Sequence, residues 1–229
     1  MIWLVITALA GPPTWEVVLS EDGWNEVATR SADVGEVRIH HRREGDIDCL
    51  WGRVTVDVPV DRLIEVAEDV ESAPRWTSNE IVHSRTLSKN GTSRDFLQSL
   101  DIPNWTLVAD RYWMLRGERV KRDTGWSFQW DRLDAAQAYP EAHAEVMAWN
   151  AKAIEPPVNR GAWVFDGVQG GTQVDYRACV DIGGSIPSGI QRWVAKRTLP
   201  DTMAELITEA KRRIVSAAKE TAAAPTPTP

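Results

Sequence analysis

Alternation of apolar and polar residues over most of the chain is the feature that most constrains its fold. Glu36 to Arg43 and Leu50 to Val58 carry most of their apolar residues on one parity, which is the pattern of strands with one buried and one solvated face. Asn90-Gly91 and Gly170-Gly171 are two-residue turns of the kind that join antiparallel strands. The other segments that we predict as strands are Ile81 to Ser88, Ser93 to Asp101, Arg111 to Arg122, Trp126 to Leu133, Ala162 to Gln169 and Gln173 to Asp181.

Helical spacing replaces this alternation in three places. A first helix is predicted from Asp61 until Pro74 stops it, and a helical segment is predicted within the long loop of residues 135–159. Everything after Gly183-Gly184 follows one amphipathic stripe, in which Pro200 should bend the helix or restart it at Asp201. Because sheet and helix each have one apolar face to bury, we expect this long C-terminal helix to cover the sheet.

The two ends of the chain differ in composition from the region between them. Residues 1–10 are predicted to be a signal peptide cleaved after Ala10, because the nine-residue uncharged apolar run Ile2 to Ala10 ends in the small-x-small sequence Ala8-Leu9-Ala10. The alternative is an N-terminal strand or helix that packs on the domain. Residues 14–220 show no linker or repeat and are predicted to form one domain, followed by a disordered Ala/Pro/Thr tail at 221–229. The leader favours a periplasmic or secreted protein, with a cytoplasmic one as the alternative.

Charge and motif content exclude several functions. The chain of 229 residues has 26 basic and 33 acidic residues, which argues against nucleic acid as a partner. It contains no zinc spacing, P-loop or dinucleotide fingerprint, so no metal and no cofactor are expected. His40 and His41 are neighbours on a strand and must face opposite sides, so they cannot bind one metal ion together.

Cys49 and Cys179 should lie on the outer face of the sheet, where two free thiols are slightly favoured over a disulfide.

The parity that we assign to the interior is rich in aromatic residues. The chain has 12 Trp but only 3 Tyr and 3 Phe, and large rings of this kind either fill a core or line an apolar cavity. The expected inward residues of the strands are Tyr112, Met114, Trp126, Phe128, Trp130, Trp163, Phe165 and Tyr176. Arg116 shares the parity of Tyr112 and Met114, and a charge there needs a partner or a ligand.

Several short motifs, in their order and spacing, resemble the START lipid-transfer domain family, in particular its bacterial secreted members, within the Bet v 1-like (SRPBCC) helix-grip superfamily. These motifs are Trp15-Glu16, Glu21-Asp22-Gly23, Val58-Pro59-Val60-Asp61, Asp69-Val70-Glu71, Trp76, Gly161-Ala162-Trp163 and Asp181-Ile182-Gly183-Gly184-Ser185-Ile186-Pro187. The family's Pro-Trp-Pro and Arg-Asp motifs are present with altered order, as Ile102-Pro103-Asn104-Trp105 and Asp110-Arg111-Tyr112. In that alignment Arg116 falls on the position of an inward basic residue of sterol-binding members.

The resemblance implies an α+β helix-grip fold, in which a curved antiparallel sheet wraps around the long C-terminal helix over a hydrophobic cavity. It implies a monomer that binds and transfers a single lipid or other hydrophobic ligand, with that helix as the gate. The expected ligand-binding residues are Trp76, Tyr112, Met114, Arg116, Trp126, Phe128, Trp130, Trp163, Phe165, Tyr176, Ile190, Trp193 and Val194. Residues 191–220 carry seven basic against four acidic residues, which favours transient contact with a membrane surface.

Two other functions remain open at this point. The first is an enzyme on the same fold, of the polyketide cyclase/aromatase or hydratase type, for which no inward carboxylate or histidine is apparent. The second is a structural or interaction module whose interior is simply a filled core.

Overall fold

One antiparallel sheet of nine strands is the frame of the molecule, in the order β1-β2-β3-β9-β8-β7-β6-β5-β4. The computed structural model describes residues 12–78, 81–102, 108–183 and 188–223, with the side chains of 188–195 and 221–223 left out of the description. The strands are β1 Asn25–Ala32, β2 Gly35–Glu44, β3 Ile47–Val56, β4 Ile81–Asn90, β5 Ser93–Leu100, β6 Arg111–Lys121, β7 Gly125–Leu133, β8 Val158–Val168 and β9 Gly171–Asp181.

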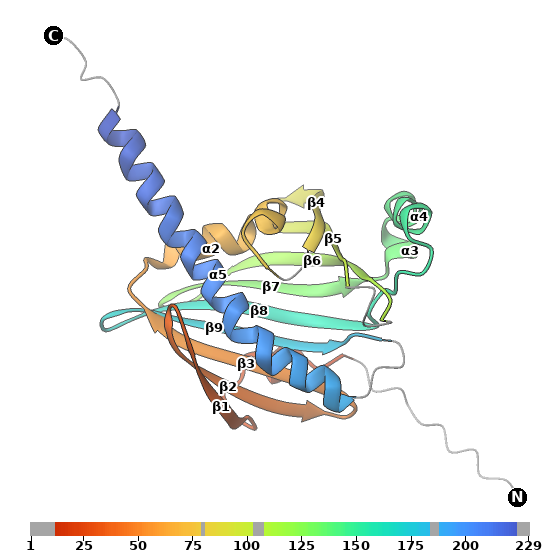
Figure 1. Cartoon of the computed structure of the whole chain (residues 1–229), viewed down its shortest axis with the longest axis horizontal. Coiled ribbons are helices and arrows are strands. Elements are labelled where there is room, and N and C mark those ends of the chain that lie inside the picture. Colours follow the sequence, from red (N-terminus) through yellow and green to blue (C-terminus); the bar gives the residue numbers. More distant parts are fainter. Residues whose placement is uncertain (1–11, 79–80, 103–107, 184–187, 224–229) are drawn as a thin grey trace, which may run out of the picture.

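Helices cover both faces of this sheet. They are α1 Trp15–Leu19, α2 Val60–Glu68, the 3₁₀ helix η1 Val70–Arg75, α3 Ala135–Ala138, α4 Pro140–Trp149 and α5 Ser188–Ala223. Figure 1 shows α5 crossing one face of the sheet diagonally, with its last turns extending past the sheet. We call the face under α5 the concave face and the opposite one the convex face. Among the described helices, none is long and apolar enough to cross a membrane.

The strands expected from the alternating pattern are all present, with boundaries within a few residues of those predicted. The two predicted hairpin turns are confirmed, and Gly91 adopts a positive φ of 58° that favours glycine. β1 and α1 were not predicted. β1 is an edge strand exposed along most of its length, so its sequence lacks the alternation that a half-buried strand needs.

Helix α5 lies directly on the backbone of β3 because Gly52 has no side chain. A Cβ atom at Gly52 would clash with Met203 Sδ and lie 3.2 Å from Leu199. Leu199, Met203 and Leu206 are buried at this crossing.

Of the two alternatives predicted at Pro200, a bend or a restart at Asp201, the restart is wrong, since α5 is continuous through Pro200. Burial of Leu199 and Met203, on either side of the proline, keeps both parts of the helix on the same surface.

Polar contacts tie the C-terminal half of α5 to the elements that precede β4. Arg213 donates hydrogen bonds to Glu209 Oε1, to Asp69 Oδ2 and to Ser72 Oγ, each at 2.8 Å. Thr77, two residues after η1, donates to Glu205 Oε2 at 2.9 Å. This half of the helix is therefore held by hydrogen bonds as well as by apolar packing.

A buried ion network holds α1 on the convex face. Asp175 is 1% exposed and accepts hydrogen bonds from both Arg53 and Arg177 at 2.7–2.8 Å. Burial alone would raise the pKa of Asp175, but the hydrogen bonds and charges of these two guanidinium groups outweigh burial and lower it. Arg177 also donates to the carbonyls of Leu19 and Ser20 at 2.7 and 2.9 Å. The guanidinium thereby satisfies carbonyls that the end of a helix leaves without partners.

Cys49 and Cys179 form a disulfide bond, so the prediction of two free thiols is wrong. The two residues are directly opposite on β3 and β9, with Cα atoms 4.1 Å apart. Both lie on the convex face, as predicted, and are buried together with Val18 of α1 and Ile47. Alternation gives the face of each cysteine, but it cannot show that strands so distant in the sequence are neighbours.

Replacing Cys179 by serine should lower the free energy of unfolding by about 2–5 kcal/mol, because the bond joins residues 130 positions apart and restricts the unfolded chain. Urea unfolding of the oxidised protein and of the variant measures this difference. Cys49→Ser is the matched control and should give the same loss, with no further loss in the double variant. Equal unfolding midpoints for wild type and variants would show that the bond does not stabilise the fold.

Candidate functional site: the concave face of the sheet

Aromatic side chains from three neighbouring strands meet on the concave face. Trp126 of β7 lies opposite Phe165 of β8, and Phe128 lies opposite Trp163. Trp163 in turn lies opposite Tyr176 of β9. Directly opposed residues share a face, and these side chains belong to or pack against the core cluster that includes Leu199 and Met203 of α5. The inward orientation predicted for Trp126, Phe128, Trp130, Trp163, Phe165 and Tyr176 is confirmed.

The rings are packed in specific pairs rather than as a random cluster. Trp163 and Tyr176 have ring centroids 4.6 Å apart in an edge-on arrangement, and Trp130 lies 5.7 Å from Tyr176. Two glycines make room for these rings. A Cβ at Gly161 would clash with the ring of Trp130, and one at Gly117 would clash with Phe128.

Part of this aromatic surface is not covered by protein. Trp113, Trp126 and Tyr176 pack against the core cluster of the concave face but are only partly buried. Trp76, at the end of η1, is also partly buried and donates from Nε1 to Ser72 Oγ at 3.0 Å. The described side chains therefore leave accessible apolar surface on the face that α5 crosses.

Polar groups on this face are mostly satisfied by protein partners. Trp130 Nε1 donates to Asn159 Oδ1 at 2.9 Å. Arg111 is 3% exposed and donates to the carbonyls of Ala109, Ile182 and Gly183. Burial lowers the pKa of this arginine. Arg111 thus fastens the segment that leads from β9 into α5.

A histidine and a carboxylate also face inward, contrary to prediction. His41 Nε2 and Asp48 Oδ1 are 2.6 Å apart, with side chains 14% and 12% exposed. His41 lies opposite the buried Leu50, and Asp48 lies opposite Val180, both of which belong to the concave side. His40 faces the other way and stacks on Trp51. Asp48 was missed because the predicted strand began at Leu50, whereas β3 begins at Ile47 and includes Asp48.

The orientation predicted for Tyr112, Met114 and Arg116 is wrong. Tyr112 and Met114 are buried on the convex face under α3 and α4, with Ala135, Ala142 and Val146. The concave residues of β6 are instead Trp113 and Leu115. Alternation could not settle the face, because both parities of β6 carry large apolar side chains, Tyr112 and Met114 on one and Trp113 and Leu115 on the other.

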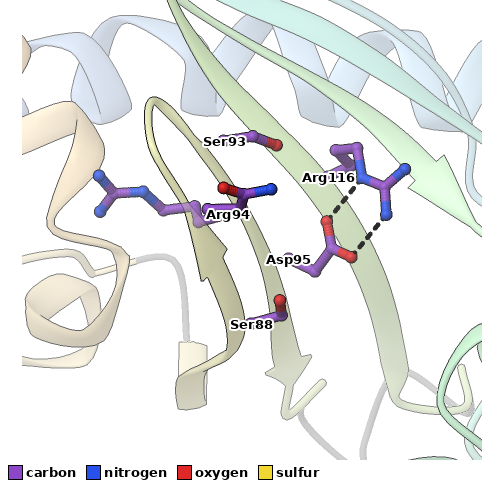
Figure 2. Close-up of a pocket in the computed structure, with 6 residues that line it drawn as sticks. Ser88, Ser93, Arg94, Asp95 and Arg116 are labelled. Carbon is purple, nitrogen blue, oxygen red and sulfur yellow. Dashed lines mark hydrogen bonds and ion pairs between the residues drawn. The ribbon is translucent and has the colours of Figure 1, made fainter.

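Arg116 has its partner on the convex face. Its Nε and Nη2 atoms donate to the two oxygens of Asp95, each at 2.8 Å, as the dashed lines in Figure 2 show. Tyr139 Oη donates to Asp95 Oδ2 at 2.7 Å. The side chain of Arg116 is 59% exposed at a surface pocket of about 330 Å³. Its charge therefore requires no interior ligand.

The remaining predicted site residues are not tested by these contacts. Ile190, Trp193 and Val194 lie in the first turns of α5, whose side chains are outside the described part of the structure. Within the described residues, no group of three or more His, Cys, Asp or Glu side chains could hold a metal ion.

Comparison with solved structures gives the fold. Human STARD10 superposes with a TM-score of 0.72 at 15% identity, over 89% of this chain and 79% of that protein. The STAR-related lipid transfer protein of Xanthomonas axonopodis gives 0.63 at 19% identity, over 83% of this chain and 99% of that fragment. Zhui aromatase/cyclase of Streptomyces gives 0.53 at 14% identity, over 73% and 96% of the two chains.

The sequence itself matches no protein-family model and no curated protein. The likeness is therefore one of architecture: element order, a curved antiparallel sheet and a long C-terminal helix across its concave face. By this architecture the chain has the START, or helix-grip, fold.

Proposed function

We propose that this protein binds one lipid or similar hydrophobic molecule between the concave face and α5, and carries it between membranes. The observation that carries the proposal is the accessible aromatic surface of Trp113, Trp126 and Tyr176 on the face that α5 crosses. Removing a lipid from a bilayer costs about 0.8 kcal/mol per CH₂ group. An enclosed apolar surface is what can recover this free energy. The fold neighbours include proteins named for lipid transfer.

Native mass spectrometry of gently purified protein should detect one lipid-sized adduct per chain. Trp126→Ala should lower the fraction of protein that retains the adduct, because the substitution removes accessible ring surface from the concave face. Trp149→Ala is the matched control, since Trp149 is 51% exposed on α4. Protein that stays free of adduct, even after incubation with phospholipid and sterol vesicles, would favour a filled core and an interaction module instead.

A second candidate function is catalysis on the same face. The inward His41–Asp48 pair favours it, since a carboxylate that orients an imidazole is a common arrangement for proton transfer. Two fold neighbours are aromatase/cyclases by name. The ligand is extracted and incubated with the protein for a prolonged time. A ligand whose mass and fragmentation do not change supports carriage. Conversion of the ligand by the wild type, but not by His41→Asn, would establish an enzyme.

We further propose that α5 is the gate through which the ligand enters. The exposed Lys211 and Lys219 near its C-terminal end would face an anionic membrane during transfer. Movement of α5 away from η1 must break the contact between Thr77 and Glu205.

Cysteines at positions 77 and 205, joined by a short bismaleimide, should abolish lipid transfer between vesicles. The fold should persist, because maleimides react with free thiols and leave the native disulfide intact. Each single-cysteine variant, treated with the same reagent, is the control and should still transfer lipid. Transfer at the wild-type rate by fully cross-linked protein would contradict the gate.

We also propose export to the periplasm or the medium. The buried Cys49–Cys179 disulfide supports export, because such bonds persist mainly in oxidising compartments. α1 begins at Trp15 and is capped by Thr14, so cleavage after Ala10 would leave it intact.

Mass spectrometry of the protein from its native host should therefore find an N-terminus at Gly11. An intact Met1 on abundant cytosolic protein would contradict export.

A further inference from the structure

One tyrosine hydroxyl on the concave face has no hydrogen-bond partner. The chain contains three tyrosines, and two of them are satisfied on the convex side. Tyr112 Oη lies 3.0 Å from His143 Nδ1, and Tyr139 Oη donates to Asp95. Tyr176 makes no such bond within the described part of the chain. Buried hydroxyl groups are normally paired with protein or with ordered water.

Tyr176 lies on the same face of the sheet as the proposed ligand space. The residue lies near the middle of β9 on the concave face, opposite Gly52 on β3 and Trp163 on β8. Its ring packs between Trp130 and Trp163, and the indole N–H of Trp130 is already used by Asn159. The side chain is only partly buried, so an additional molecule can reach it.

The surroundings of this hydroxyl are electrically neutral. Burial alone raises the pKa of Tyr176 to about 12, and no charged side chain contributes. The pKa of Tyr112 is also raised to about 12, mainly by burial, but Glu155, Arg132 and Asp134 contribute there. A charged ligand group beside Tyr176 would be buried without a counter-charge, which is unfavourable. A neutral oxygen would complete the site.

We infer that Tyr176 hydrogen-bonds to an uncharged oxygen of the ligand, which makes the ligand a hydrophobic alcohol or carbonyl compound. This inference rests on the proposed function and deepens it. A pure hydrocarbon would leave the phenol unpaired, as would a lipid that places only alkyl chain at this point.

The test compares 1-tetradecanol with tetradecane on the full chain after removal of endogenous lipid. Displacement of N-phenyl-1-naphthylamine, a neutral fluorescent probe, gives both affinities. Tyr176→Phe should weaken tetradecanol binding by about 5- to 10-fold, the effect of one neutral hydrogen bond, and leave tetradecane binding unchanged. Tyr112→Phe is the matched control on the convex face and should change neither affinity. Circular dichroism and thermal melting check that both variants fold.

The possible outcomes are distinguishable. Unchanged tetradecanol affinity in Tyr176→Phe would overturn the inference, because the Tyr176 hydroxyl would then make no hydrogen bond to the alcohol. Equal weakening of alcohol and alkane would also overturn it, since the loss would lie in packing. Wild-type protein that binds neither compound, and no lipid from vesicles, would refute the proposed function itself.

Discussion

The contact of α5 with the backbone of β3 is the constraint on which the rest of the structure depends. Gly52 lets Leu199 and Met203 rest against the strand, and hydrogen bonds that involve Arg213 and Thr77 hold α5 further along its length. α5 crosses the face that presents the aromatic residues of β7, β8 and β9. Both the accessible rings and the unpaired hydroxyl of Tyr176 follow from this arrangement.

The two faces of the sheet are stabilised by different interactions. The convex face is covered by α1, α3 and α4, and it holds the disulfide, the Asp175 ion network and the Arg116–Asp95 pair. Each charge in these two networks has a partner of opposite sign at hydrogen-bond distance. The concave face carries the aromatic and aliphatic core cluster, with the guanidinium groups of Arg94 and Arg119 over the rings of Phe128 and Trp126. A neutral, hydrophobic ligand matches the concave face, and the convex face supplies rigidity.

Much of this architecture could be predicted from the sequence, because alternation, turn glycines and one amphipathic stripe are local signals. Trp126, Trp130 and Trp163 were placed correctly for that reason. The failures have physical causes. β6 carries large apolar side chains on both parities, so parity could not place Tyr112 or Arg116, and the disulfide depends on strand order. Asp48 was missed because β3 begins earlier than predicted, whereas His41 shares the parity of the inward Val37 and Ile39 in β2 and could have been found from the sequence.

Residue-level photoaffinity mapping tests the central claim, that ligand lies against the concave face under α5. A diazirine-bearing long-chain alcohol would be bound, irradiated and located by tandem mass spectrometry. Successive residues of one strand point to opposite faces, so the two faces are distinguished within single peptides. The account predicts adducts on Trp113, Trp126 and Tyr176, whose rings are accessible on the concave face, and none on their neighbours Met114, Ser127 and Arg177. Adducts confined to convex residues, or spread equally over both faces, would contradict it.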